Sequence, residues 1–206
     1  EYFRDDQRRD ILFFADNMFR YIQARNELST ILDQIPNEGG YEPTVFSDVK
    51  VLQDRLSSNE NGSITSVQTI YVPADDISDP AVQFIQHEMD SIIVLSRKVA
   101  EQGIRPAVDL TLTNSSLLTP EIVGDRHYLL SVKVQALLQK YESLKGIIAI
   151  IGENELSPAD RSDYAKAKKL IANFTQNMNV MTKHNGVPGD FFTREETLKS
   201  IEEIII

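Results

Sequence analysis

The sequence predicts an α/β domain with parallel strands, followed by a domain made of helices alone. Residues 11–15 (ILFFA) are an unbroken apolar run, which is typical of a strand covered on both faces. Residues 64–71 alternate in character and are rich in β-branched side chains, which favours another strand. Near residue 114 the composition changes, and apolar residues then recur at helical spacing to the end of the chain. We therefore predict two domains, residues 1–114 and residues 115–206.

The first domain is expected to alternate helices with strands after a charged lead-in over residues 1–10. After the first strand come two helices, a strand, a turn, a helix and a strand, at residues 18–35, 44–56, 64–71, 73–76, 80–89 and 92–95. The apolar residues that define the two helices are Met18, Tyr21, Ile22, Leu28, Ile31, Leu32, Ile35, Val45, Val49 and Leu52. This order implies a parallel sheet with crossover connections. Because sheets usually have about four to six strands, we expect the missing strands to lie before Glu1.

The second domain is predicted to contain three main helices, two of them with clear start signals. Ser157, followed by Pro158 and Asp160, is typical of a helix N-terminus, and Thr193 with Glu196 forms a capping box. The expected core-facing residues are Leu130, Val134, Leu137, Tyr141 and Leu144 in the first helix, Tyr164, Ala167, Ile171 and Phe174 in the second, and Leu198, Ile201 and Ile205 in the last.

Composition excludes several classes of function. The chain has 206 residues, a formal net charge of −10 and no cysteine. A nucleic-acid coat or an anionic-membrane surface needs net positive charge, so neither is expected. Without cysteine there is no disulfide or thiolate metal site. No apolar run approaches the roughly 20 residues of a membrane span, so we expect no membrane insertion.

Known catalytic motifs are also absent from the sequence. There is no GxxxxGK[ST] phosphate loop, no HExxH zinc motif and no nucleophile elbow. The three histidines, His87, His127 and His184, are too scattered along the chain to suggest a set of metal ligands.

The position of Asp16, directly after the first apolar run, suggests a site. Ligands of open α/β sheets bind beyond the carboxyl ends of the strands, and an acid there can hold a water molecule of a magnesium ion. The alternative is a helix cap, since Asp16 or Asn17 precedes the first predicted helix and can accept hydrogen bonds from its free amide groups. The residues alone favour the cap and leave the metal role as the alternative.

Long segments point to a family. Residues 62–76, GSITSVQTIYVPADD, closely resemble the strand and turn of the catalytic (beta) subunit of F-type rotary ATPases, and residues 11–20 resemble its Walker B strand and the helix that follows. Other segments that fit the same subunit, in the same order, are residues 35–36, 40–44, 95–97, 103–109, 122–128 and 148–157. The similarity covers nearly the whole chain and is better than that to the noncatalytic alpha relative, which lacks the YVPADD turn.

This resemblance implies the second half of a RecA-like P-loop nucleotide-binding domain, followed by an all-α C-terminal domain. The phosphate loop and the general-base glutamate would then lie before Glu1. Carried over by position, Asp16 is catalytic and holds Mg²⁺ through water, and Arg20 lies toward the terminal phosphate of ATP or ADP. Asn17 and Tyr71 line the nucleotide site. Alternatives are a surface salt bridge for Arg20 and strand-end packing for Tyr71.

Three residues differ from the family's adenine pocket. Arg105 stands where the family stacks a tyrosine on the base, and Met178 and His184 fall where it has phenylalanines. Arginine can still stack on a base, and methionine packs adaptably, so all three remain candidate nucleotide-binding residues.

The segment that contacts the rotating shaft in this family is retained in part. Glu155, Leu156 and Ser157 are present, Pro158 and Ala159 replace two acids, and Asp160 remains. We expect residues 155–157 and Asp160 to contact the shaft, with weaker charge pairing.

The resemblance also implies partners and a role. The chain would belong to a hetero-hexameric ring with an alpha-type subunit around a gamma-type shaft, as a peripheral protein on the cytoplasmic side of a membrane, or in the cytoplasm if no membrane sector is coupled. The ring would couple ATP hydrolysis or synthesis to rotation, while the 206-residue chain alone would be inactive. The alternatives are a structural ring subunit without turnover and a regulatory nucleotide-binding domain unrelated to rotation.

Overall fold

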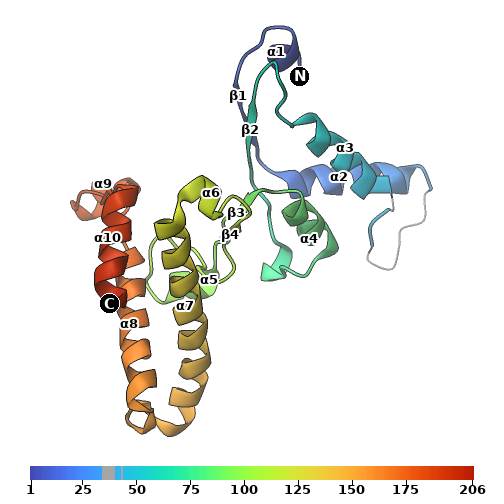
Figure 1. Ribbon diagram of the computed structural model, residues 1–206. Helices are drawn as coiled ribbons and strands as arrows, with labels where there is room; N and C mark the ends of the chain where they lie inside the picture. Colours follow the sequence, from blue (N-terminus) through green and yellow to red (C-terminus); the bar gives the residue numbers. More distant parts are fainter. Residues whose placement is uncertain (34–39, 43) are drawn as a thin grey trace. The chain divides into compact units, whose positions relative to one another are not determined.

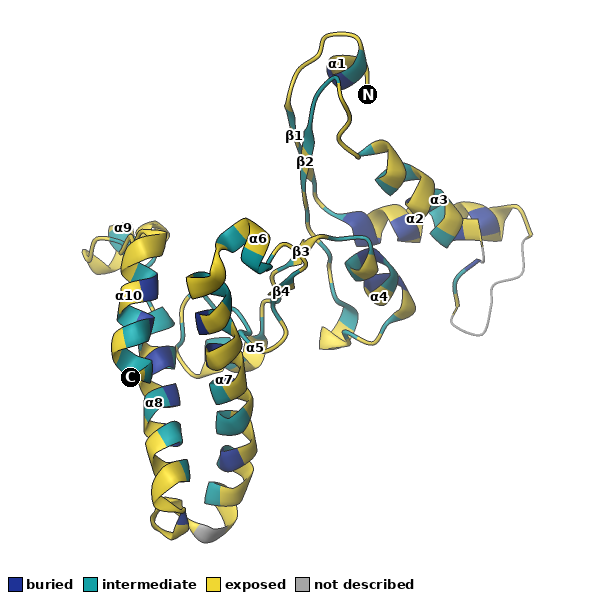
Figure 2. Ribbon diagram, viewed as in Figure 1, coloured by how far each residue is buried: buried dark blue, intermediate teal, exposed yellow. Residues whose placement is uncertain are grey.

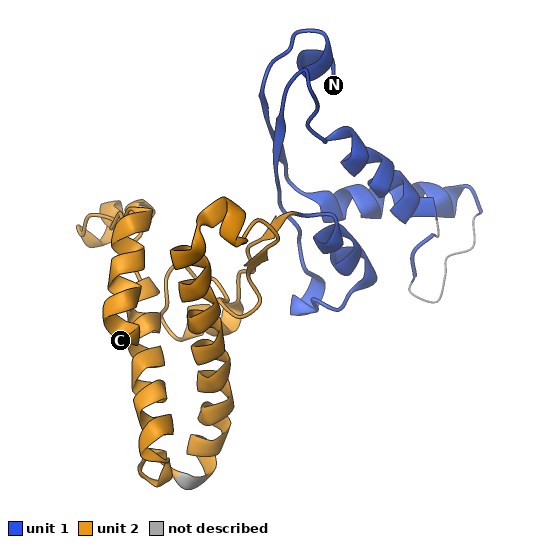
Figure 3. Ribbon diagram, viewed as in Figure 1, with its two compact units in different colours: residues 1–89 blue, residues 90–206 orange. Residues whose placement is uncertain are grey.

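The computed structural model describes residues 1–33, 40–42 and 44–206, which form two compact units. The first unit runs from Glu1 to Met89 and the second from Asp90 to Ile206 (Figure 3). This division falls ahead of the domain boundary predicted at residues 114 and 115. Each unit has a hydrophobic core of its own.

The first unit is built on two parallel strands joined by helices (Figure 1). Strand β1 (Ile11–Ala15) pairs with β2 (Ile64–Gln68), with Ile11 opposite Ile64 and Ala15 opposite Gln68. The connection holds helices α2 (Met18–Ile31) and α3 (Thr44–Arg55), as parallel strands require a long crossover. The short helix α1 (Tyr2–Asp5) precedes β1. The first two predicted strands and the two helices between them are therefore confirmed, while Ile35 and Pro36, at the expected end of the first helix, lie outside the described residues.

The prediction that the first strand is covered on both faces is wrong for the described chain. Leu12 and Phe14 are 60% and 66% exposed, whereas Ile11, Phe13 and Ala15 on the opposite face are half-buried (Figure 2). The reason is that the β1–β2 sheet has two strands among the described residues, and of the β1 residues only Ala15 packs against the core of the unit.

The core of the first unit lies where α2, α3 and α4 (Pro80–His87) meet. Its buried residues are Met18, Phe19, Ile22, Val45, Val49, Ala81, Val82 and Ile85. Asp79 caps α4 by accepting a hydrogen bond from the backbone N–H of Ala81 at 2.8 Å. Met18 and Ile22 of α2 are buried as predicted, but Phe19 is buried as well. The other predicted core residues of this segment, Tyr21, Leu28, Ile31 and Leu32, are exposed.

The prediction of a buried third strand at residues 92–95 is also wrong. Strand β3 contains only Ser91–Ile92 and pairs antiparallel with β4 (Asn114–Ser115), within the second unit. Ile93 and Leu95 are exposed. The pairing partner lies more than twenty residues downstream, so local hydropathy could not reveal it. Helix α5 (Arg97–Glu101) lies between these strands in the sequence.

Helices dominate the second unit. Helix α6 (Pro120–Val123) leads into the long α7 (Asp125–Ile151), which packs against α8 (Pro158–Phe174) and α10 (Arg194–Ile205). The connections hold the short helices η2 (Glu153–Glu155), η3 (Asn179–Met181) and α9 (Thr182–Asn185). The buried residues of the three long helices are Leu130, Val134, Leu138, Leu144, Tyr164, Ala167, Leu170, Leu198 and Ile201.

Both predicted helix starts are confirmed. Ser157 Oγ accepts a hydrogen bond from the backbone N–H of Asp160 at 3.1 Å, and Thr193 and Glu196 form the reciprocal bonds of a capping box. Helix α7 ends at Gly152, whose φ of 88° favours glycine because other residues are strained there. None of the described helices combines the length and hydropathy that crossing a membrane requires.

Candidate nucleotide-binding site

Asp16 lies at the carboxyl end of β1 and is held there by Thr69, which follows β2. Thr69 Oγ1 donates a hydrogen bond to Asp16 Oδ1 at 2.6 Å. The backbone N–H of Thr69 donates to the carbonyl of Ala15, and the carbonyl of Thr69 accepts from the N–H of Met18, both at 2.9 Å. Because these bonds flank Asp16 on both sides, the strand pairing fixes the place of an exposed carboxylate at this edge of the sheet.

The helix cap is Asn17, not Asp16. Asn17 has an extended backbone, and its side-chain oxygen accepts a hydrogen bond from the N–H of Arg20 at 2.9 Å. This decides between the two candidate caps and leaves Asp16 without a capping role. The Arg20 side chain is exposed on the first turn of α2, with no salt bridge to any residue in the described part of the chain.

Tyr71 lies three residues beyond β2 and packs on α2. Its ring centroid is 6.2 Å from that of Phe19, with a tilt of 59° between the rings. Phe19 is buried and Tyr71 is 62% exposed, so one side of the tyrosine is anchored and the other is open. The turn after Tyr71 places Ala74 and Asp75 at positive φ, and hydrogen bonds from Ser78 lower the pKa of Asp76.

The end of the first strand therefore brings Asp16, Asn17, Arg20 and Tyr71 to one region, at the start of α2. Chemically this is an exposed carboxylate, a cation and an aromatic ring. No cluster of three or more acids or histidines that could hold a metal occurs among the described residues. A single carboxylate such as Asp16 can hold Mg²⁺ directly or through water.

In the second unit, Arg105 turns back onto its own segment. Its Nη1 donates hydrogen bonds to the carbonyls of Ala100 and Ile104 at 2.9 and 2.8 Å. Its carbonyl accepts from the N–H of Gln176 at 2.8 Å, which brings the segment of Met178 beside that of Arg105. His184 is exposed on α9, and no hydrogen bond within the described chain connects it to Arg105 or Met178. The roles of these three residues in nucleotide binding stay predictions.

The predicted shaft-contacting residues form the turn between α7 and α8. Leu156 is buried against Leu144 and Tyr164, so its side chain packs inside the unit. Asp160 forms an ion pair with Lys140 of α7 at 2.7 Å. The hydrogen bond from Lys140, and to a smaller extent that from Ser157, lowers the pKa of Asp160. Glu155 is exposed. Any surface contact of this turn must therefore be made by residues other than Leu156.

Three supporting residues were missed. Thr69 could have been found by pairing the strands in parallel register, which places it opposite Asp16. Phe19 was not predicted to be buried, because the helical spacing of apolar residues placed Tyr21 in the core instead. Lys140 gave no sequence signal, since its acidic partners are separated from it by a turn.

Comparison with known families settles the relationship of the chain. The sequence profile of the ATP synthase alpha/beta family, nucleotide-binding domain, matches residues 1–115, more than half of the chain. The chain belongs to this family. A second profile, the C-terminal domain of V and A type ATP synthase, matches residues 117–185. The predicted fold class, the second part of a nucleotide-binding α/β domain followed by a helical domain, is confirmed.

Solved structures of the family are similar over most of the chain. An ATP synthase subunit, NeqB from Nanoarcheaum equitans, matches with a TM-score of 0.82 and 24% identity over 100% of this chain and 50% of its own; it supports the fold alone. The assembled ATPase EscN of the enteropathogenic E. coli type III secretion system matches with a TM-score of 0.79 and 26% identity, over 95% of this chain and 45% of its own. A prototypical ATPase from the type III secretion system of pathogenic bacteria matches with a TM-score of 0.74 and 26% identity, over 100% of this chain and 56% of its own.

These comparisons define the family but not the subunit type. The chain spans about half the length of these structures. The C-terminal match is to V and A types, whereas the sequence resemblance implied the F type. The comparisons therefore show membership in the ATP synthase alpha/beta family and leave the subunit type as a proposal.

Proposed function

We propose that this chain is the C-terminal half of a catalytic-type subunit of a rotary-ATPase-family ring, in which Mg-ATP hydrolysis or synthesis is coupled to rotation. The observation that carries the proposal is the position of Asp16: a carboxylate at the carboxyl edge of parallel strands, held by Thr69 and not used as the helix cap. Acids in this position serve metal-nucleotide binding in α/β proteins of this kind.

Each residue of this region has a role that suits its chemistry. Asp16 holds a magnesium-bound water, and Arg20 places positive charge toward the terminal phosphate. Tyr71, anchored by Phe19, offers its open side to the nucleotide. Bound magnesium neutralises charge that develops on the phosphate oxygens. Asn17 positions Arg20 by capping the helix that carries it.

The uncovered face of β1 and β2 supports the idea that the domain is completed by other residues. Leu12, Phe14 and Val67 expose apolar surface on this face. We propose that the phosphate-binding half of the domain covers it. The purified 206-residue chain should then show no ATP hydrolysis above buffer in a phosphate-release assay; measurable turnover would mean that the essential groups are already present.

The sharpest test of the proposal compares two acids at opposite ends of β1 in the full-length subunit, assembled in its ring. Asp10 accepts hydrogen bonds from Ser63 much as Asp16 accepts one from Thr69, which makes it a matched control. Asp16→Asn should lower ATPase activity by at least about a hundredfold, because charge stabilisation at the phosphates contributes about that much or more. Asp10→Asn should leave activity unchanged. Equal activity of both variants would remove the catalytic role of Asp16.

In the assembly we propose an alpha-type neighbour that supplies an arginine, and a central shaft contacted through Glu155 and Ser157 beside the buried Leu156. The ring would lie peripherally on a membrane or free in the cytoplasm. Replacing Glu155 by Gln should weaken coupling between hydrolysis and rotation in a single-molecule assay without changing nucleotide affinity.

A second candidate is a ring ATPase like those of type III secretion. Its support is the similarity to two such ATPases at 26% identity. The two candidates differ in the composition of the ring: the full-length subunit should form a ring by itself in the second case and should require an alpha-type partner in the first.

A third candidate is a structural ring subunit without turnover. It is supported by Arg105, whose guanidinium donates hydrogen bonds to its own segment instead of being free to stack on a base. Native mass spectrometry and ATPase assays of the full-length subunit separate the three.

A further inference from the structure

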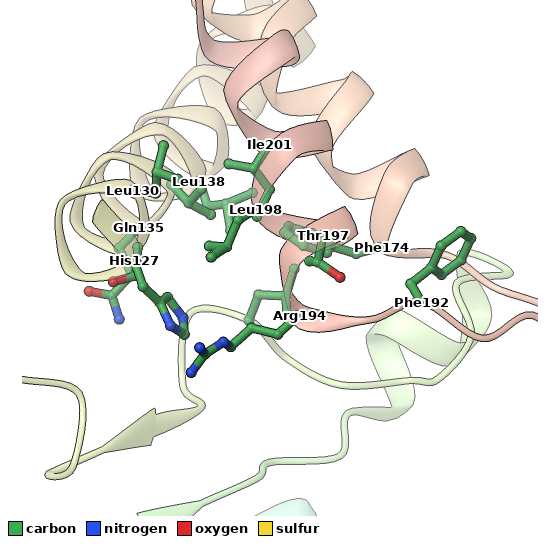
Figure 4. A pocket seen from close by; sticks show the side chains of 13 residues that line it. His127, Leu130, Gln135, Leu138, Phe174, Phe192, Arg194, Thr197, Leu198 and Ile201 are labelled. Atoms are coloured by element: carbon green, nitrogen blue, oxygen red, sulfur yellow. The ribbon is translucent and has the colours of Figure 1, made fainter. Parts of the chain in front are cut away.

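The helical unit contains a cavity that none of the proposed roles uses. It has a volume of about 410 Å³ and lies among α7, α8 and α10 (Figure 4). Its walls are mainly apolar, with Leu130, Leu138, Phe174, Leu198 and Ile201 contributing. The volume is within the range of about 300–1,000 Å³ typical of small-molecule sites. No residue that lines it belongs to the candidate nucleotide site.

Two polar groups in the lining lack partners. His127 Nδ1 is buried and makes no hydrogen bond within the described structure. Such atoms are rare, because a buried polar atom without a partner is costly. Arg194, the first residue of α10, makes no hydrogen bond or ion pair with the described residues. Its two acidic neighbours in the helix are engaged elsewhere, Glu195 with Arg126 and Glu196 with Thr193.

These groups lie at the same part of the cavity. In Figure 4 the guanidinium of Arg194 lies toward the imidazole of His127, while the leucines and Ile201 lie beyond them. The cavity therefore offers one polar end with a cation, and one apolar end.

We propose that this cavity binds a small amphipathic carboxylate. The carboxylate would accept two parallel hydrogen bonds from Arg194. The hydrocarbon body would fill the space between α7 and α10. An engineered cavity of about 150 Å³ takes up benzene, so this one has room for a chain of about eight carbons. A nucleotide or inorganic phosphate does not fit, because the walls give a polar ligand few partners.

The test is an NMR titration of the 206-residue chain with octanoate, with octan-1-ol and octylamine as ligands of the same length but different charge. Octanoate should shift the signals of His127, Arg194 and Thr197, and bind at least about tenfold more tightly than either control, because a charged hydrogen bond is lost with each of them. Equal affinity for the three ligands would show that binding is hydrophobic and does not depend on the carboxylate, and would overturn the proposal.

Variants on α10 locate the binding group. Arg194→Gln should weaken octanoate binding about tenfold, whereas Lys199→Gln, which removes a charge of the same sign from an exposed position outside the cavity, should not change it. If Arg194→Gln and Lys199→Gln bind octanoate equally, or if octanoate causes no shifts at millimolar concentration, the cavity is not a carboxylate site.

Discussion

Asp16 and Thr69 form the contact on which the candidate site depends. The hydroxyl of Thr69 donates to the carboxylate, and the backbone of Thr69 bonds on both sides of Asp16. The carboxylate itself was predictable, because it directly follows an apolar strand. Its partner Thr69 is separated from it by the whole crossover, so it can be predicted only by pairing the two strands in parallel register.

Removing the hydroxyl of Thr69 should affect activity more than folding. In Thr69→Val the backbone bonds remain, so we expect the urea midpoint of the chain to change little. In the assembled full-length enzyme, kcat should fall by about tenfold, since Asp16 loses the bond that orients it. Thr69→Ser restores the hydroxyl and should recover most of the rate. A valine variant with full activity would show that Asp16 needs no such support.

At the scale of elements, helix caps were predicted well, because their signals are local. The caps at Ser157 and Thr193 are examples. The short β3 was misjudged, because its burial depends on β4 and not on its own hydropathy. The outer face of β1 was misjudged for a similar reason: whether Leu12 and Phe14 are covered depends on elements outside the described sheet.

The turn between α7 and α8 should respond to pH through Lys140. Its ammonium pairs with Asp160 and Asp163 at 2.7 and 2.6 Å and lowers the pKa of Asp160. A lowered pKa in the folded state stabilises the fold above the ordinary aspartate pKa, and this contribution is lost as pH falls through the folded value. Lys140→Met should therefore lower the urea midpoint at pH 7, and the difference from wild type should shrink below about pH 4.

The control for this prediction is Lys145→Met on the same helix, whose ion pair is with Glu142 one turn away. Because both residues of this pair belong to α7, the pair does not join two helices. Lys145→Met should therefore change the urea midpoint little at every pH. If the two lysine variants behave alike, Lys140 does not link α7 to α8.

At the scale of the whole chain, the two units have separate cores and should respond separately to core mutations. Ile22 and Leu170 are fully buried, one in each core. Ile22→Ala should destabilise the first unit by about 2–5 kcal/mol, and Leu170→Ala the second by a similar amount. Hydrogen exchange should show lost protection only in the unit that carries the change. Equal loss in both units for each variant would contradict separate cores.

The central claim, that Asp16 faces a metal-bound nucleotide, is tested most directly by paramagnetic relaxation in the full-length subunit loaded with ADP and Mn²⁺ in place of Mg²⁺. The two ends of β1 and β2 are separated by the length of a strand, and this effect falls steeply with distance, so the ends can be distinguished. We predict the strongest broadening at the amides of Asp16, Thr69 and Tyr71, and much weaker broadening at Asp10 and Ser63. Broadening centred on Asp10 and Ser63, or equal at both ends, would contradict the account.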